Sequence, residues 1–362
     1  MEAVSLAACG QKKTGENSVC IYLLRISAIF AIIVMNTAKY DIAGCDVPSF
    51  NWQVLNLFGS LARWAVPVFV MIAGAVFLDP EKEMTVKTIF KTHLFKMLCI
   101  YVFWSFIYAV IQNMMKNGIA NTGFLKNVMM ETVKGPVHFW YIPMLSGLYL
   151  ITPFLRVLVK NSSKLLLQYF LALCFIFGCL FYLLQVLAPF SAICEAAGKL
   201  KVNFVAGYTG YFVLGYYLCR YPLQKNMRRL LYAAGAACIG ITVIGTYLLS
   251  LKKGGLDETL YSNLSPNYAV IGAAVFVFYE ENVKKSNFLN KSINLIRTVS
   301  LCSFGVYIIH YFSYMIFSRT GFGITAINPL LSVPLVSLGI YLLCLSVSFL
   351  LSKVRFFNKY LV

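Results

Sequence analysis

Charged residues are scarce in this sequence, and acidic ones most of all. Only 12% of the 362 residues are charged, and Asp and Glu together number 13. A soluble domain of this length needs more charge on its surface, so the composition excludes an ordinary soluble protein. The 31 Lys and Arg give a formal net charge of +18, but they are spread among short loops. That distribution argues against nucleic-acid binding, which gathers basic residues on one soluble face.

Motifs for metal, redox and nucleotide chemistry are also missing. None of the 11 cysteines forms a CxxC pair, and most lie inside apolar runs, where they act as small fillers. Cys45 and Cys194 both fall in expected outer loops, so a bridge between them is possible. The sequence has no HExxH, no nucleophile elbow and no P-loop, and the glycines of GYTGYFVLG have no strand–turn–helix context. We expect no metal site.

Apolar residues make up 60% of the chain and come in blocks of about 20, the length that spans a bilayer. This pattern predicts an all-α integral membrane protein, a bundle of about ten transmembrane helices. The expected spans are residues 20–38, 52–78, 97–115, 138–155, 165–188, 202–219, 230–250, 267–280, 299–317 and 330–351. Residues 1–362 then form a single transmembrane domain, with a polar tail over 1–19, too polar for a signal peptide, and a membrane core over about 20–351.

The positions of Lys and Arg predict the orientation. With the N-terminus inside, the inner segments hold 20 of these residues and the outer segments hold 9. Cytoplasmic loops of membrane proteins collect basic residues, so both termini are expected in the cytoplasm, with the chain in a cell membrane, a bacterial cytoplasmic membrane in our interpretation.

Two arginines lie inside expected spans, where a charge is costly and is usually functional or paired. Arg25 either snorkels to the headgroups or faces the bundle interior. Arg63 lies about 16 Å deep at ~1.5 Å per residue and is expected to face a polar cavity. Asn36 follows Arg25 by eleven residues, close to three helical turns, so the two share a face. Asn36 either lines that face or makes an interhelical hydrogen bond.

The chain has three histidines. His93 lies in the basic stretch KTHLFK, His138 opens HFWYIPMLSGLYLITPFLR at the outer end of the fourth span, and His310 closes SFGVYIIH near the middle of the ninth. A histidine near aromatic residues is often only a packed, hydrogen-bonded residue. His138 is the first candidate for a direct role, and His310 is the second.

Six segments in this order resemble the membrane-bound acyltransferase-3 family over nearly the whole chain, about residues 22–351. They are RISAIFAIIVMN, RWAVPVFVMIAGAVFLDP, FWSFIY, HFWYIPMLSGLYLITPFL, GYFVLGYYL and SFGVYIIH. The resemblance is closest to stand-alone members. It implies a ten-span core that takes an acyl group, commonly acetyl, from a coenzyme A thioester on the cytoplasmic side. The acceptor is a hydroxyl of a glycan or lipid-linked sugar at the outer side.

The resemblance also implies site residues, with two departures. Arg25 belongs to the arginine–ten residues–histidine motif and would bind the coenzyme A phosphates, a task suited to guanidinium. The motif's histidine, the expected base, is replaced by Asn36, and a carboxamide cannot take a proton from a hydroxyl near pH 7. The inner Arg-x-x-Arg motif falls on His93 and Lys96.

These observations predict a membrane-bound O-acyltransferase that modifies an envelope glycan or its lipid-linked precursor. Arg25, Lys96 and His93 would hold the donor, and Arg63 would stabilise the polar cavity or the developing oxyanion. His138 is the first candidate base and Asp41 a second. The alternative is a non-catalytic member that binds or translocates a glycan or a small hydroxylated molecule. An introduced change at position 36 is a third explanation of the asparagine.

Overall fold

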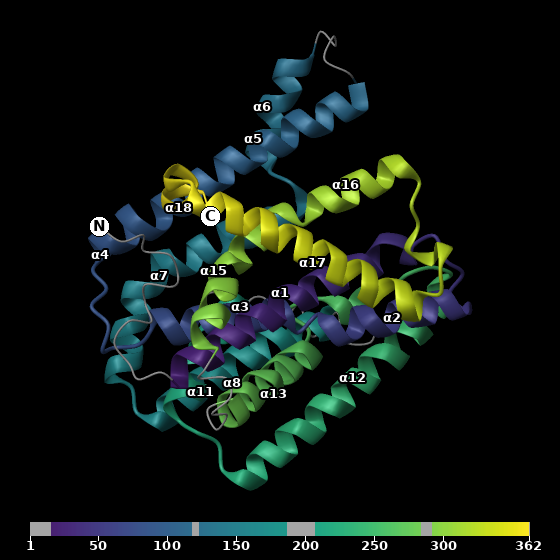
Figure 1. Cartoon of the computed structure of the whole chain (residues 1–362). Helices are drawn as coiled ribbons and strands as arrows, with labels where there is room; N and C mark the ends of the chain where they lie inside the picture. Colours follow the sequence, from purple (N-terminus) through teal and green to yellow (C-terminus); the bar gives the residue numbers. More distant parts are fainter. Residues whose placement is uncertain (1–15, 118–122, 187–206, 284–291, 362) are drawn as a thin grey trace.

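The computed structural model describes residues 16–117, 123–186, 207–283 and 292–361, and these residues form helices without a strand. Figure 1 shows a helical bundle in which α1 and α3 lie near the centre. The α-helices are α1 (Glu16–Ile42), α2 (Phe50–Ala62), α3 (Ala65–Phe77), α4 (Val86–Thr88), α5 (Phe95–Asn117), α6 (Phe124–Lys134), α7 (Tyr141–Asn161), α8 (Lys164–Cys174), α9 (Phe181–Val186), α11 (Tyr208–Arg220), α12 (Lys225–Lys253), α13 (Pro266–Asn282), α15 (Ile293–Ile309), α16 (Tyr311–Thr320), α17 (Pro329–Lys353) and α18 (Arg355–Tyr360).

Short helices of other types join or extend these elements. They are the π-helices η2 (Ile89–Leu94) and η4 (Phe175–Leu180) and the 3-10 helices η3 (Val137–Trp140), η7 (Thr259–Tyr261) and η9 (Ile324–Ala326). A π-helical turn inside an α-helix is uncommon and is frequently found at functional sites. Of the two π-helices, η2 carries His93, one of the residues singled out from the sequence.

Seven helical segments among the described residues are long and apolar enough to cross a membrane, and the bent pair α15–α16 makes an eighth. The expected span 267–280 corresponds to α13, which has 17 residues. The expected span 202–219 corresponds to α11, whose 13 residues begin at Tyr208, and the start of that span lies outside the described residues. The multi-pass membrane architecture is therefore confirmed, whereas the number ten stays a prediction.

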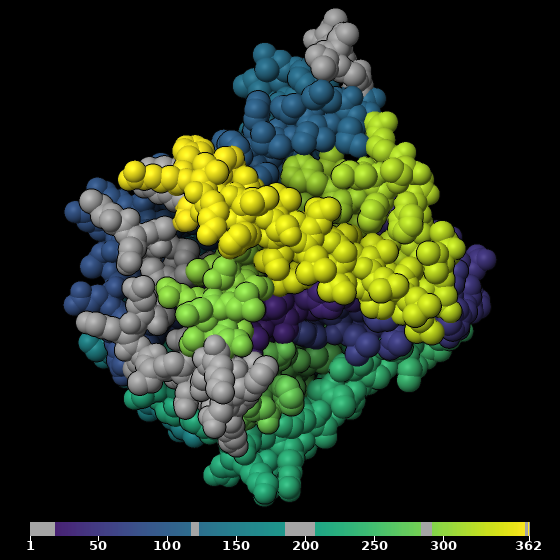
Figure 2. Space-filling model, in the orientation of Figure 1, coloured from purple at the N-terminus to yellow at the C-terminus, as the bar shows by residue number. Residues whose placement is uncertain are grey.

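The outer surface of the bundle is apolar, as a lipid-facing surface must be. On α12, the side chains of Leu230, Ile241, Ile244 and Leu248 are exposed. Other peripheral helices also expose apolar side chains, for example Leu335 and Leu350 on α17. Figure 2 shows α17 running diagonally across one face, with α12 along the lower edge.

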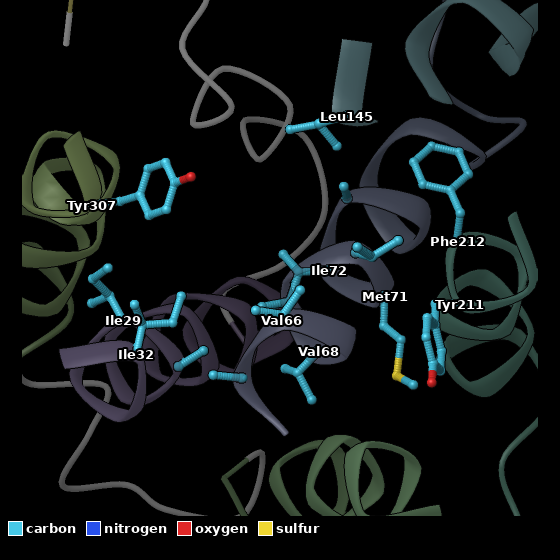
Figure 3. Packing of buried hydrophobic residues seen from close by; sticks show 14 of the residues in the cluster. Ile29, Ile32, Val66, Val68, Met71, Ile72, Leu145, Tyr211, Phe212 and Tyr307 are labelled. Carbon is cyan, nitrogen blue, oxygen red and sulfur yellow. The ribbon is translucent and has the colours of Figure 1, made fainter. Parts of the chain in front are cut away.

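The core is built around α3, which packs between α1 and α11 (Figure 3). Two glycines bring α3 and α11 together. A Cβ on Gly74 would lie 1.7 Å from the carbonyl oxygen of Phe212, and a Cβ on Gly215 would lie 1.9 Å from that of Met71. Membrane helices approach this closely where small residues meet the partner's backbone, and van der Waals contact then stabilises the pair.

Two expected spans are interrupted inside the bundle. The span predicted over 52–78 is two helices, α2 and α3, and Arg63 and Trp64 lie at their junction. The span predicted over 299–317 breaks at His310, where α15 and α16 meet at a bend of 44°. Cys45 is a free thiol in the structure; Cys194 lies outside the described residues, so the suggested pair stays untested.

Candidate active site

A cavity of about 1010 Å³ lies inside the bundle, and all six residues predicted from the sequence line it: Arg25, Asn36, Arg63, His93, Lys96 and His138. Its length can be judged from α5, because Lys96 in the first turn and Lys116 in the last turn both line it. Twenty residues of α-helix span about 30 Å, which matches the hydrocarbon thickness of a bilayer. The cavity therefore extends across most of the membrane-spanning part.

Three of the predicted residues line the cavity near the starts of α1 and α5, the end that we call the inner end. Arg25 of α1 and His93 of η2 are largely buried, and Lys96 follows His93 by less than one turn. The imidazole of His93 packs edge-on against Phe77, with ring centroids 4.8 Å apart. Asn36 lines the same cavity three turns along α1 from Arg25, on the face that the eleven-residue spacing predicts.

The bend between α15 and α16 lies farther along the cavity and leaves backbone carbonyls without helical partners. Side chains satisfy two of them. The Tyr307 carbonyl lies 2.6 Å from Nδ1 of His310. The Ile308 carbonyl accepts a hydrogen bond of 2.8 Å from the Tyr108 hydroxyl and lies 3.3 Å from Nε2 of His138. A backbone carbonyl can only accept, so each imidazole donates to its carbonyl, and these hydrogen bonds hold the two rings at the bend.

The contacts of His310 determine which nitrogen is available for chemistry. Its Nδ1 must carry the proton to donate to Tyr307, so Nε2 of the neutral ring has a free electron pair. That Nε2 lies 3.2 Å from the side-chain nitrogen of Asn36, which donates to it. The His310 side chain is fully buried in the bundle and lines the cavity. A proton acceptor therefore lies against the position where the motif places its histidine.

His138 forms the second half of a histidine pair. Its ring centroid lies 5.2 Å from that of His310, and its ring stacks on Tyr311 at 4.9 Å. Because Nε2 of His138 donates to Ile308, its Nδ1 holds the free electron pair, and Nδ1 has no hydrogen-bond partner among the described residues. The hydroxyl of Tyr307 donates to the backbone carbonyl of His138, which ties the 3-10 helix η3 to α15. The pair thus presents two imidazoles to one part of the cavity.

Arg63 lies at the junction of α2 and α3, buried as its depth in the sequence predicts. Its guanidinium carbon lies 3.9 Å above the Tyr261 ring, and Nη1 donates to the Tyr261 carbonyl at 3.3 Å. The Tyr261 hydroxyl in turn donates to Oδ1 of Asn56 at 2.5 Å. These contacts anchor the segment between α12 and α13 inside the bundle, so Arg63 supports the cavity wall as well as lining it.

The other end of the cavity, which we call the outer end, is bordered by the last turns of α1, α5 and α16. Lys39 of α1 pairs with Glu258 at 2.8 Å. Burial raises the pKa of the Glu258 carboxyl, but the hydrogen bond and the charge of Lys39 outweigh it and hold that pKa below its usual range. Lys116 of α5 and Arg319 of α16 also line this end.

Of two further residues considered from the sequence, Asp41 does not line the cavity, whereas His310 lies closer to the site than the sequence indicated. The Asp41 carboxylate accepts hydrogen bonds from the backbone and hydroxyl of Thr325, so it fixes a loop and is not among the cavity-lining residues. His310 is the opposite case. The motif SFGVYIIH carried the signal, but its contact with Asn36 joins residues 274 apart in the sequence and could not be read from either one alone. Within the described ranges, no group of three or more His, Cys, Asp or Glu side chains could hold a metal ion.

Comparison with known protein families supports the resemblance read from the sequence. The family model described as an acyltransferase domain, that of the acyltransferase-3 family, matches residues 19–353, which is most of the chain. Curated proteins and solved structures give no significant match. The chain therefore belongs to the acyltransferase-3 family and is a multi-pass membrane acyltransferase.

Proposed function

We propose that this protein transfers an acyl group, acetyl in the first instance, from a coenzyme A thioester to a hydroxyl of an envelope glycan or lipid-linked sugar. The observation that carries the proposal is one continuous cavity with a cationic inner end and a histidine pair about three turns of α1 away. This arrangement suits a reaction whose donor is anionic at one end and whose reacting group needs a proton acceptor.

In this proposal the inner end holds the donor. Arg25, Lys96 and His93 contact the phosphates of coenzyme A, with the Arg25 guanidinium as the bidentate partner. Glu258 is the one acidic residue among the cavity-lining residues that the structure describes, and it lines the outer end. The inner end, together with both chain termini, faces the cytoplasm, where acyl-CoA is made; the membrane is a bacterial cytoplasmic membrane.

The chemistry takes place beside Asn36. The acceptor hydroxyl oxygen attacks the thioester carbonyl carbon while its proton moves to Nε2 of His310. The C–S bond then breaks, the thiolate of coenzyme A leaves, and the proton returns from the imidazolium to that sulfur. Asn36 can turn its amide to follow this cycle: the NH₂ group faces neutral Nε2, and the carbonyl oxygen accepts from the protonated ring.

The remaining residues support this step. His138 holds the carbonyl of Ile308 at the bend and lines the acceptor side, where it is the second candidate for the base. Arg63 keeps the cavity polar and contributes positive potential to the developing oxyanion. The apolar bundle excludes water and suppresses hydrolysis of the thioester.

A non-catalytic role, binding or translocating a glycan or a small hydroxylated molecule, is the second candidate, because Asn36 replaces the motif's histidine. The two are separated by incubating purified protein with radiolabelled acetyl-CoA and a panel of glycan acceptors. Transfer of label to an acceptor, lost in His310→Gln, supports the acyltransferase. Binding of coenzyme A without transfer to any acceptor would favour the non-catalytic role.

A further inference from the structure

Most of the charged side chains that line the cavity are positive. Among the described residues that line it, six are cationic, namely Arg25, Lys39, Arg63, Lys96, Lys116 and Arg319, and a single one, Glu258, is acidic. Two of the cations, Arg25 and Lys96, belong to the inner end and are accounted for by the phosphates of the donor. The cations of the outer end lie too far along the cavity to contact the same phosphates, since Lys96 and Lys116 are about 30 Å apart along α5.

Of the three outer cations, only Lys39 has an acidic partner among the described residues. Glu258 already pairs with Lys39 at 2.8 Å, so this carboxylate and this ammonium cancel. Lys116 and Arg319 have no ion-pair partner in the part of the chain that the structure describes. Both are exposed in the last turns of their helices, where they can contact a ligand entering from outside. The Arg63 charge adds to the same field from within the bundle.

Uncompensated cations at this end require a reason. Outer segments of membrane proteins usually carry few Lys and Arg. Polar groups that can accept or donate hydrogen bonds lie next to both residues in the cavity wall, Gln112 one turn before Lys116 and Ser318 directly before Arg319. A cationic mouth that faces water concentrates anions and positions them for hydrogen bonding.

We propose that the outer end of the cavity binds an oxyanion carried by the acceptor, a phosphate or a carboxylate, and that Lys116 and Arg319 are its ligands. This inference rests on the proposed acyltransferase function and specifies its acceptor as an anionic sugar. The oxyanion can be the diphosphate of a lipid-linked sugar or the carboxylate of a uronic acid residue. In both cases it anchors one end of the acceptor and leaves a sugar hydroxyl to reach His310.

The test compares matched charged and neutral probes on the full-length protein in nanodiscs of neutral phosphatidylcholine. The probes are a polyprenyl diphosphate-linked N-acetylglucosamine, a glucuronic acid-containing disaccharide and the corresponding neutral glucose disaccharide. One of the two anionic probes should bind at least about tenfold more tightly than the neutral disaccharide, and which one identifies the source of the oxyanion. Binding should weaken as salt is raised, because exposed charges are screened.

Charge-removal variants then assign the site. The double variant Lys116→Gln, Arg319→Gln should weaken binding of the anionic probe by about tenfold or more, while the affinity for coenzyme A stays unchanged. Lys252→Gln is the matched control, since Lys252 is exposed on α12 and does not line the cavity. Equal binding of charged and neutral probes, or equal losses in the double variant and the control, would overturn the inference. If coenzyme A itself does not bind, the failure lies with the proposed function instead.

Discussion

The side-chain nitrogen of Asn36 lies 3.2 Å from Nε2 of His310, the imidazole nitrogen that carries no proton in the neutral ring. This relationship bears on the motif's missing histidine. The asparagine cannot act as a base, but it contacts a residue that can, and that residue is held from its other side by the Tyr307 carbonyl. In the proposed reaction, the bend between α15 and α16 therefore supplies the base that α1 lacks.

His310→Gln should lower acyl-transfer turnover by roughly 100-fold or more, because general-base catalysis contributes about 10²–10⁴. Glutamine retains a polar side chain of similar length but cannot take the proton. Initial rates with radiolabelled acetyl-CoA measure the effect, and coenzyme A affinity, measured by calorimetry, should not change. His138→Gln is the comparison variant and should lose less. If His138→Gln abolished transfer while His310→Gln retained it, the base would be His138.

Asn36→Leu should lower kcat by about tenfold with no change in coenzyme A affinity. Leucine has the same branched shape but cannot follow the protonation state of His310 with a hydrogen bond, so the imidazolium loses a partner worth about 1–1.5 kcal/mol. Asn36→His should retain or exceed native turnover, since a second imidazole at this position can itself accept the proton. Equal kcat for native protein and Asn36→Leu would remove Asn36 from the reaction.

Arg25→Ala should weaken coenzyme A binding by at least about tenfold, because hydrogen bonds to a charged group are worth about 1.5–3 kcal/mol. Calorimetry with the purified protein measures this affinity directly. Arg229→Ala is the matched control, because Arg229 is also a basic residue, expected on the same side, but is exposed on α12 and does not line the cavity. An unchanged affinity in Arg25→Ala would place the donor elsewhere.

Much of this fold could be predicted from the sequence, because the length of an apolar run is a local property. The breaks at Arg63 and His310 could not, since each depends on a partner far along the chain. Arg63 is held by Tyr261, 198 residues away. The cavity-lining residues were singled out by their types, by the α1 spacing and, for Lys96, by the family resemblance. Their meeting in one cavity, and the role of His310 beside Asn36, required tertiary structure.

The contact between α3 and α11 makes a prediction about stability. Gly74→Ala or Gly215→Ala should lower the melting temperature by at least about 5 °C, because the new Cβ meets backbone that cannot move as a side chain would. Gly240→Ala in α12 is the control, since no atom lies within 4 Å of its Cβ position. Intrinsic fluorescence during heating in detergent measures both. Equal melting temperatures for Gly74→Ala and Gly240→Ala would contradict the close approach of these helices.

The orientation of the chain in the membrane determines which end of the cavity meets acyl-CoA, and it can be tested by cysteine labelling. Single cysteines at Lys87 and Arg229, in a background without native cysteines, should react with an impermeant thiol reagent only after the cells are permeabilised, because the basic-residue bias puts them inside. A single cysteine at Lys252 should react in intact cells. All three positions are exposed in the structure, so burial does not explain a lack of labelling. Labelling of position 87 from outside would reverse the orientation. Arg25 and Lys96 would then face away from the cytoplasm, and the donor site could not lie at that end.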